Sequence, residues 1–173
     1  MKFSRLVVGI AGAAAAVVAS AGGNPEFVAF PSGYDAMFTN YTTMNRAGSA
    51  AVAKMYANDV AVASYRKGQP AASGSIIVME VYKPKKDADG KPIVGSDGVN
   101  EIAELAAIAV MERRDRWPAG YAADDRVGTW GFAIYKPDGK PKENDLACVT
   151  CHTPMEQQDF LFSHQRLADF VKR

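Results

Sequence analysis

The chain has 173 residues, with 20 basic and 19 acidic side chains and a formal net charge of +1 at pH 7. A charge so close to zero offers no electrostatic footprint for nucleic acid or for an anionic membrane surface, so neither is expected as a partner. The length is enough for one domain with a single hydrophobic core.

Residues 1–21 have the pattern of a secretory signal peptide. Lys2 and Arg5 precede an apolar run over residues 6–18, and Ala-Ser-Ala then forms a small-x-small cleavage site. The apolar run is shorter than the roughly 20 residues that a membrane span needs, although an uncleaved N-terminal anchor is the alternative. We therefore expect export to the periplasm, with residues 22–173 as one domain that has no membrane contact after cleavage.

The first predicted elements after the signal peptide are short. Residues 34–43 predict a short helix. Residues 50–58 alternate enough for a strand, though their alanines keep a helix open. Asn58 is an N-cap or turn signal, and a helix over residues 60–66 would end at Gly68.

The middle of the chain predicts β-structure. Residues 75–82 are the strongest strand because they are β-branched and aromatic. Residues 83–100, rich in Lys, Pro, Asp and Gly, predict an exposed hairpin or long loop. Residues 105–111 and 129–135 predict two further strands.

The C-terminal part contains Cys148-Val149-Thr150-Cys151-His152, the attachment motif of c-type haem. Each cysteine can form a thioether with one vinyl group of the porphyrin, and the histidine that follows can give the iron a ring nitrogen. A helix carrying the motif would be capped by Asn144 or Asp145, and residues 160–171 predict a terminal amphipathic helix.

A bare Cys-x-x-Cys also occurs in zinc sites and in thiol redox sites. Structural zinc usually needs four ligands, but the chain has two cysteines and, besides His152, one histidine, His164. A thioredoxin-like site would lie between an early strand and a helix. The motif therefore predicts one haem c attached through Cys148 and Cys151, with His152 as the metal ligand and no thiol left for a disulfide.

The position of the motif indicates the fold class. The all-α electron carriers place it near the N-terminus, and the proline-rich middle with three strands disfavours a four-helix bundle. We expect an α+β fold, in which an antiparallel β-sheet with flanking helices holds the covalently attached haem c against one face.

Seven stretches, taken in order and at their spacing, resemble a known family. They are Phe30-Pro31-Ser32-Gly33-Tyr34, Tyr56-Ala57-Asn58, Tyr65-Arg66-Lys67-Gly68, Gly74-Ser75-Ile76-Ile77-Val78-Met79-Glu80, Val110-Met111-Glu112, Gly128-Thr129-Trp130-Gly131-Phe132 and the CxxCH motif. The family is that of cytochrome P-460, with its uncrosslinked relative cytochrome c-prime-beta. The similarity runs through most of the mature chain.

The resemblance implies a small periplasmic protein that forms a homodimer, with a ferric haem bound by histidine on one side and open on the other. Its best-known members oxidise hydroxylamine, and in them a lysine on the central strand is joined to the haem edge. In this sequence Met79 stands at the lysine position, so the same bond cannot form. The family also has a carboxylate in the pocket on the open side of the haem, and Glu112 stands at that position in this sequence.

Three residues form the expected pocket. Met79 has three interpretations: a pocket wall, a sulfur ligand that closes the iron, or an ordinary core residue. Ile77 shares its strand face, whereas Lys83 on that face is about 13 Å away. Glu112, if it faces the haem, could accept protons from an N–OH substrate; otherwise it belongs to a solvent-facing ion-pair group at the strand end.

Three functions follow from these interpretations. One is redox chemistry on hydroxylamine or a related small nitrogen species, with Glu112 as the catalytic base and electrons passed to a periplasmic electron-transfer protein. The second is non-catalytic binding of nitric oxide or carbon monoxide, as in cytochrome c-prime-beta. The third is simple electron transfer with His152/Met79 ligation.

Overall fold

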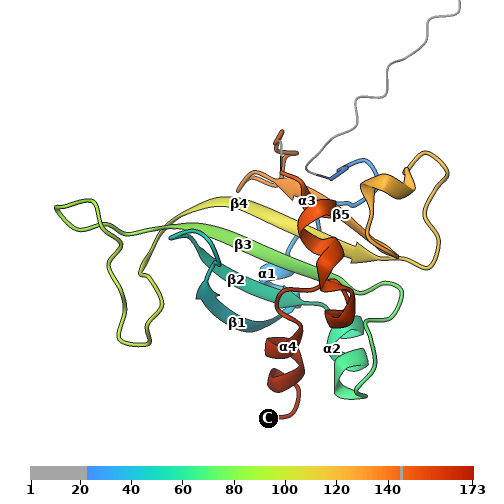
Figure 1. The fold of residues 1–173 in the computed structure, drawn as a ribbon, viewed down its shortest axis with the longest axis horizontal. Helices are drawn as coiled ribbons and strands as arrows, with labels where there is room; N and C mark the ends of the chain where they lie inside the picture. The colour runs from blue at the N-terminus through green and yellow to red at the C-terminus, as the bar shows by residue number, and fades with distance from the viewer. Residues whose placement is uncertain (1–22, 145) are drawn as a thin grey trace, which may run out of the picture.

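The protein is described by a computed structural model over residues 23–144 and 146–173, and its centre is a five-stranded antiparallel sheet in the order β1-β2-β3-β4-β5 (Figure 1). The predicted α+β class is confirmed, while the predicted signal peptide and Asp145 lie outside the described residues. No helix in the described ranges is long and apolar enough to cross a membrane. The elements in chain order are α1 (Tyr34–Met37), β1 (Thr39–Asn45), β2 (Val52–Ala57), α2 (Asp59–Arg66), β3 (Ile76–Pro84), β4 (Ile102–Arg113), η1 (Ala123–Asp125), β5 (Trp130–Tyr135), α3 (Cys148–His152), η2 (Thr153–Gln158) and α4 (His164–Phe170).

The strand predictions are confirmed, with longer bounds for β4, and the ambiguous range 50–58 contains a strand, β2, over Val52–Ala57. The helix predicted over residues 34–43 is wrong beyond Met37, because the threonine-rich segment that follows pairs with β2 as β1. The terminal helix begins at His164 rather than at residue 160, because Asp159 and Phe160 have left-handed backbone angles that no helix continues.

The two faces of the sheet carry two separate hydrophobic clusters. One face, called here the motif face, packs against α2, α3 and α4, and its sheet residues include Ala53, Met55, Ile77, Met111 and Phe132. The opposite face packs against the N-terminal segment with α1 and the loop before β5; its buried residues include Val28, Tyr34, Tyr56, Val78, Ile108, Val110, Tyr121, Ala133 and Tyr135. All six residues of β5 are buried because both faces are covered.

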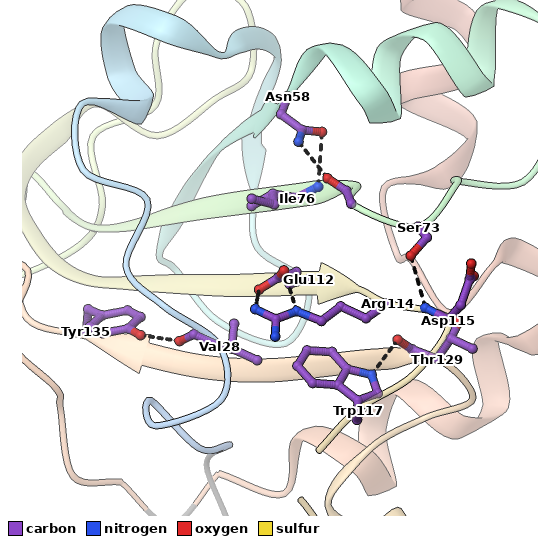
Figure 2. Close-up of polar contacts among 11 residues, drawn as sticks. Val28, Asn58, Ser73, Ile76, Glu112, Arg114, Asp115, Trp117, Thr129 and Tyr135 are labelled. Atoms are coloured by element: carbon purple, nitrogen blue, oxygen red, sulfur yellow. Dashed lines mark hydrogen bonds and ion pairs between the residues drawn. The ribbon is translucent and has the colours of Figure 1, made fainter.

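Asn58 links α2 to β3 (Figure 2). Its side-chain oxygen accepts hydrogen bonds from the backbone N–H groups of Ala61 at 3.1 Å and Ile76 at 3.0 Å, and its amide donates to the Gly74 carbonyl at 2.8 Å. The predicted cap is thus confirmed, with the added role of holding the start of the central strand. Gly68, at φ 67°, follows the end of the helix in the left-handed conformation that glycine favours.

A carboxylate is buried on the face opposite the motif. Glu80 is 5% exposed and accepts hydrogen bonds from the hydroxyls of Tyr34 at 2.7 Å, Tyr56 at 3.0 Å and Tyr82 at 2.9 Å. Burial, followed by the bond to Glu80, raises the pKa of all three phenols, that of Tyr82 to about 12. The cluster joins α1, β2 and β3 and cannot be expected from the sequence, because the residues on either side of Glu80 in the strand are apolar.

Candidate haem site

The CxxCH motif forms the short helix α3. Its cysteines are three residues apart, so both thiols lie next to each other on the same side of the helix. Both thiols are free; Cys148 is half-buried against the motif face and Cys151 is exposed. The predicted cap at Asn144 is wrong, since α3 begins after Ala147 without a side-chain cap, and the Asn144 oxygen instead accepts from a backbone N–H two residues later.

The two ring nitrogens of His152 differ: one donates a hydrogen bond, and the other is available to bind a metal. Its Nδ1 lies 2.7 Å from the carbonyl oxygen of Phe160; because a carbonyl only accepts, Nδ1–H is the donor and Nε2 is unprotonated in the neutral ring. The ring centroid is 5.0 Å from that of Phe132 on β5 and 4.9 Å from that of Phe162. Burial lowers the pKa of His152, which favours the neutral imidazole that ligates metals.

The motif face beside α3 is rich in methionine. Among the residues that the structure describes, its cluster contains Met44, Met55, Met79 and Met111. Met79 is half-buried and stands in a row of directly paired residues that crosses all five strands, and directly paired residues share a face. The row consists of Thr42, Met55, Met79, Ala109 and Ile134, and it carries no charge.

Ile77 lies in the next row, where it pairs with Met111, which in turn pairs with Phe132. The structure therefore brings Ile77 and Met79 together on the face that packs against α3, with Ile77 fully buried. Sequence reasoning missed Met55 and Met111. Each stands at an alternating strand position, but only the pairing of β2 and β4 with β3 puts them beside Met79.

Glu112 lies on the other face of the sheet. It pairs with Ile76, which precedes Ile77 and so points to the opposite side. Its carboxylate accepts hydrogen bonds from Arg114 Nε at 2.6 Å and Nη2 at 3.0 Å, and the Arg114 guanidinium stacks 4.6 Å from the ring of Trp117 (Figure 2). The prediction that Glu112 faces the same pocket as Met79 and Ile77 is therefore wrong. The ion pair of the alternative is present, but the Glu112 side chain is 13% exposed and so does not face solvent freely.

Two other residues considered from the sequence have partners away from the motif. His164 Nδ1 lies 2.8 Å from the Tyr65 hydroxyl, a contact that joins α4 to α2. Lys83 forms an ion pair with Glu104 at the exposed end of β3, where each side chain is 64% exposed.

The donor set fits haem c. Two unbridged thiols stand three residues apart, and the adjacent imidazole keeps Nε2 free for a metal. Over residues 23–144 and 146–173, no three or more His, Cys, Asp or Glu residues gather as a metal-binding group. Cys148 and Cys151 are the residues that would hold the porphyrin, and His152 the one that would hold its iron.

Comparison with known proteins gives the family. A family model described as Cytochrome P460 matches residues 31–163, which is most of the chain and includes the whole sheet, Met79 and the CxxCH motif. No curated protein matches the chain. The family implies a haem c cofactor, in agreement with the donor set of α3. The chain belongs to the cytochrome P460 family and is a c-type cytochrome.

Proposed function

We propose that this protein binds a small uncharged nitrogen species, nitric oxide first, at the open side of a haem iron held by His152. The observation that supports this most strongly is the uncharged row around Met79 on the motif face. Thioethers and methyl groups are polarisable and apolar, so a pocket lined by them favours neutral ligands over charged ones.

The residues of the chain divide into three roles. Cys148 and Cys151 fix the porphyrin through thioethers. His152, oriented through its Nδ1–H bond to Phe160, gives a nitrogen to the metal. Met79, with the residues in its row, lines the pocket wall and excludes water. When bound, haem c supplies an iron atom that can take a neutral diatomic ligand and exchange one electron with a partner.

Hydroxylamine oxidation is less well supported, because it needs a group that removes protons from the N–OH substrate. Glu112 would have supplied that group, but its carboxylate lies across the sheet and binds Arg114. From Met79 toward the end of β3, the first charged side chain on the motif face is that of Lys83, which is exposed and paired with Glu104.

Spectra of the purified holoprotein test the proposal. We expect five-coordinate ferric and ferrous forms, binding of carbon monoxide and nitric oxide to the ferrous form, and no turnover of hydroxylamine with an artificial electron acceptor. A six-coordinate spectrum that becomes five-coordinate in Met79→Leu would instead establish His152/Met79 ligation and an electron carrier. Sustained hydroxylamine turnover would instead establish that the protein is a hydroxylamine-oxidising enzyme.

We also propose that the chain is exported, loses residues 1–21, forms a homodimer and exchanges electrons with a periplasmic carrier. The signal-peptide pattern and the need to attach haem c outside the cytoplasmic membrane support the export. The intact mass of the purified protein tests it, since the mass should equal residues 22–173 plus one haem. Sedimentation of the same sample tests the dimer.

A further inference from the structure

The chain reverses sharply between η2 and α4. In the part of the chain that the structure describes, Asp159 and Phe160 are the non-glycine residues with positive φ, at 52° and 60°. Each such residue costs roughly 1–2 kcal/mol, and a bulky side chain such as Phe160 tolerates the conformation less well than aspartate does. Two in succession therefore require the surrounding structure to hold them.

The side chain of Asp159 supplies that hold. One carboxylate oxygen lies 2.6 Å from Arg113 Nη1, and the other accepts the backbone N–H of Ala71 at 2.8 Å. The Asp159 and Arg113 side chains are 11% and 23% exposed, so this charge-assisted bond is well shielded from water. Because Arg113 ends β4 and Ala71 lies in the loop between α2 and β3, Asp159 ties the reversal to the sheet and to that loop.

The reversal places the acceptor for the haem ligand. The residue after Asp159 is Phe160, whose carbonyl oxygen accepts Nδ1–H of His152 at 2.7 Å. The Phe160 N–H bonds to the Met155 carbonyl at 2.8 Å, and the next residue, Leu161, is buried in the core of the motif face. The Phe160 carbonyl therefore has its position set by the Asp159 anchor on one side and by Leu161 on the other.

We propose that Asp159, anchored by Arg113, is a positioning residue for His152: it holds the Phe160 carbonyl against Nδ1 and so sets the direction and basicity of Nε2 toward the haem iron. A partner that accepts a hydrogen bond from the Nδ1–H group makes Nε2 of the imidazole a stronger donor to iron, which favours the ferric state. The proposal rests on the part of the proposed function that makes His152 the iron ligand, and holds whichever molecule binds the open side.

Three variants of the holoprotein test it. Asp159→Asn keeps a residue that tolerates positive φ but removes the charge that Arg113 binds; Asp159→Gly removes both the strain and the anchor; Arg113→Lys keeps the charge but changes the geometry. The readouts are the iron–histidine stretching band in the ferrous resonance Raman spectrum and the midpoint reduction potential. We expect the band to move to lower frequency and broaden, and the potential to rise, most in Asp159→Gly.

The matched control is Asp138→Asn, which makes the same chemical change in an ion pair with Lys140 at an exposed turn. It should leave the Raman band and the potential at their wild-type values. Equal shifts in the control would overturn the proposal, as would Asp159→Asn and Arg113→Lys proteins that lose stability but keep the wild-type band and potential. If Asp159→Gly does not incorporate haem, the other two variants still decide.

His152→Ala distinguishes a failure of the positioning role of Asp159 from a failure of the proposed function, in which His152 is the iron ligand. If its spectrum equals that of the wild type, His152 is not the ligand, and the proposed function fails together with the positioning role. If its spectrum changes while the Asp159 and Arg113 variants show no shift, only the positioning role is lost.

Discussion

The side of the sheet that Glu112 occupies can be tested by Glu112→Gln in the holoprotein. The change removes the charge that binds Arg114 and replaces one of the two accepting oxygens by a donor. The Glu112 and Arg114 side chains are 13% and 37% exposed, so solvent weakens the pair but does not abolish it. Hydrogen bonds to charged groups contribute about 1.5–3 kcal/mol when shielded, and the exposure of Arg114 reduces this to roughly 1–2 kcal/mol.

The assay is unfolding in urea at constant haem content, because guanidinium ions would screen the ion pair. For a slope of about 2 kcal/mol/M, the midpoint should fall by about 0.5–1 M, while carbon monoxide affinity stays within twofold of wild type. Glu104→Gln is the control: it breaks the exposed pair with Lys83 and should cost less than about 0.5 kcal/mol.

The opposite pattern would refute this reasoning. If Glu112→Gln keeps wild-type stability but changes carbon monoxide affinity or hydroxylamine turnover tenfold or more, Glu112 faces the haem. The pairing of β4 with β3 described above would then be shifted by one residue, since a one-residue slip exchanges the two faces of a strand.

Three further predictions concern the rest of the fold. Glu80→Gln should lower the free energy of unfolding in urea by roughly 2–4 kcal/mol, because it leaves three phenol donors around an uncharged amide, and a loss below about 0.5 kcal/mol would mean that the cluster is not formed. All seven tyrosines have a pKa raised mainly by burial, that of Tyr82 to about 12, so the native state holds more protons than the unfolded state above pH of about 10. The free energy of unfolding in urea should therefore keep its full value below about pH 10 and fall as the pH rises toward 12, less steeply in Tyr82→Phe. A free energy of unfolding that does not change over this pH range would contradict the prediction. Asn58→Ala should cost about 2 kcal/mol and speed amide exchange at the start of both α2 and β3, whereas exchange confined to α2 would show that the bond to Ile76 contributes nothing.

Much of the site could be predicted from the sequence because its determinants are local. The two thiols and the imidazole of the CxxCH motif are contiguous, so their chemistry does not depend on the fold. The shared face of Ile77 and Met79 follows from the two-residue period of one strand, which holds wherever that strand lies. The strands β3 and β5 were predictable from their β-branched and aromatic composition.

What the sequence alone did not determine depends on register between strands. Whether Met111 or Glu112 faces the motif side is decided by the pairing of Ile77 with Met111, and the long β3–β4 connection leaves that pairing open. The same holds for Met55 beside Met79, since β2 and β3 are separated by α2 and a loop.

The tertiary structure alone decided how the His152 ring is held against the Phe160 carbonyl. By itself, the sequence of this protein predicts that a haem c is attached at Cys148 and Cys151 next to His152, because that covalent chemistry needs only neighbouring residues. Asp159 and Arg113 are 46 residues apart, and a carboxylate and a guanidinium so distant in the chain meet only when packing brings β4 against the segment after η2. The uncharged wall around Met79 arises in the same way, from five strands that each contribute one side chain.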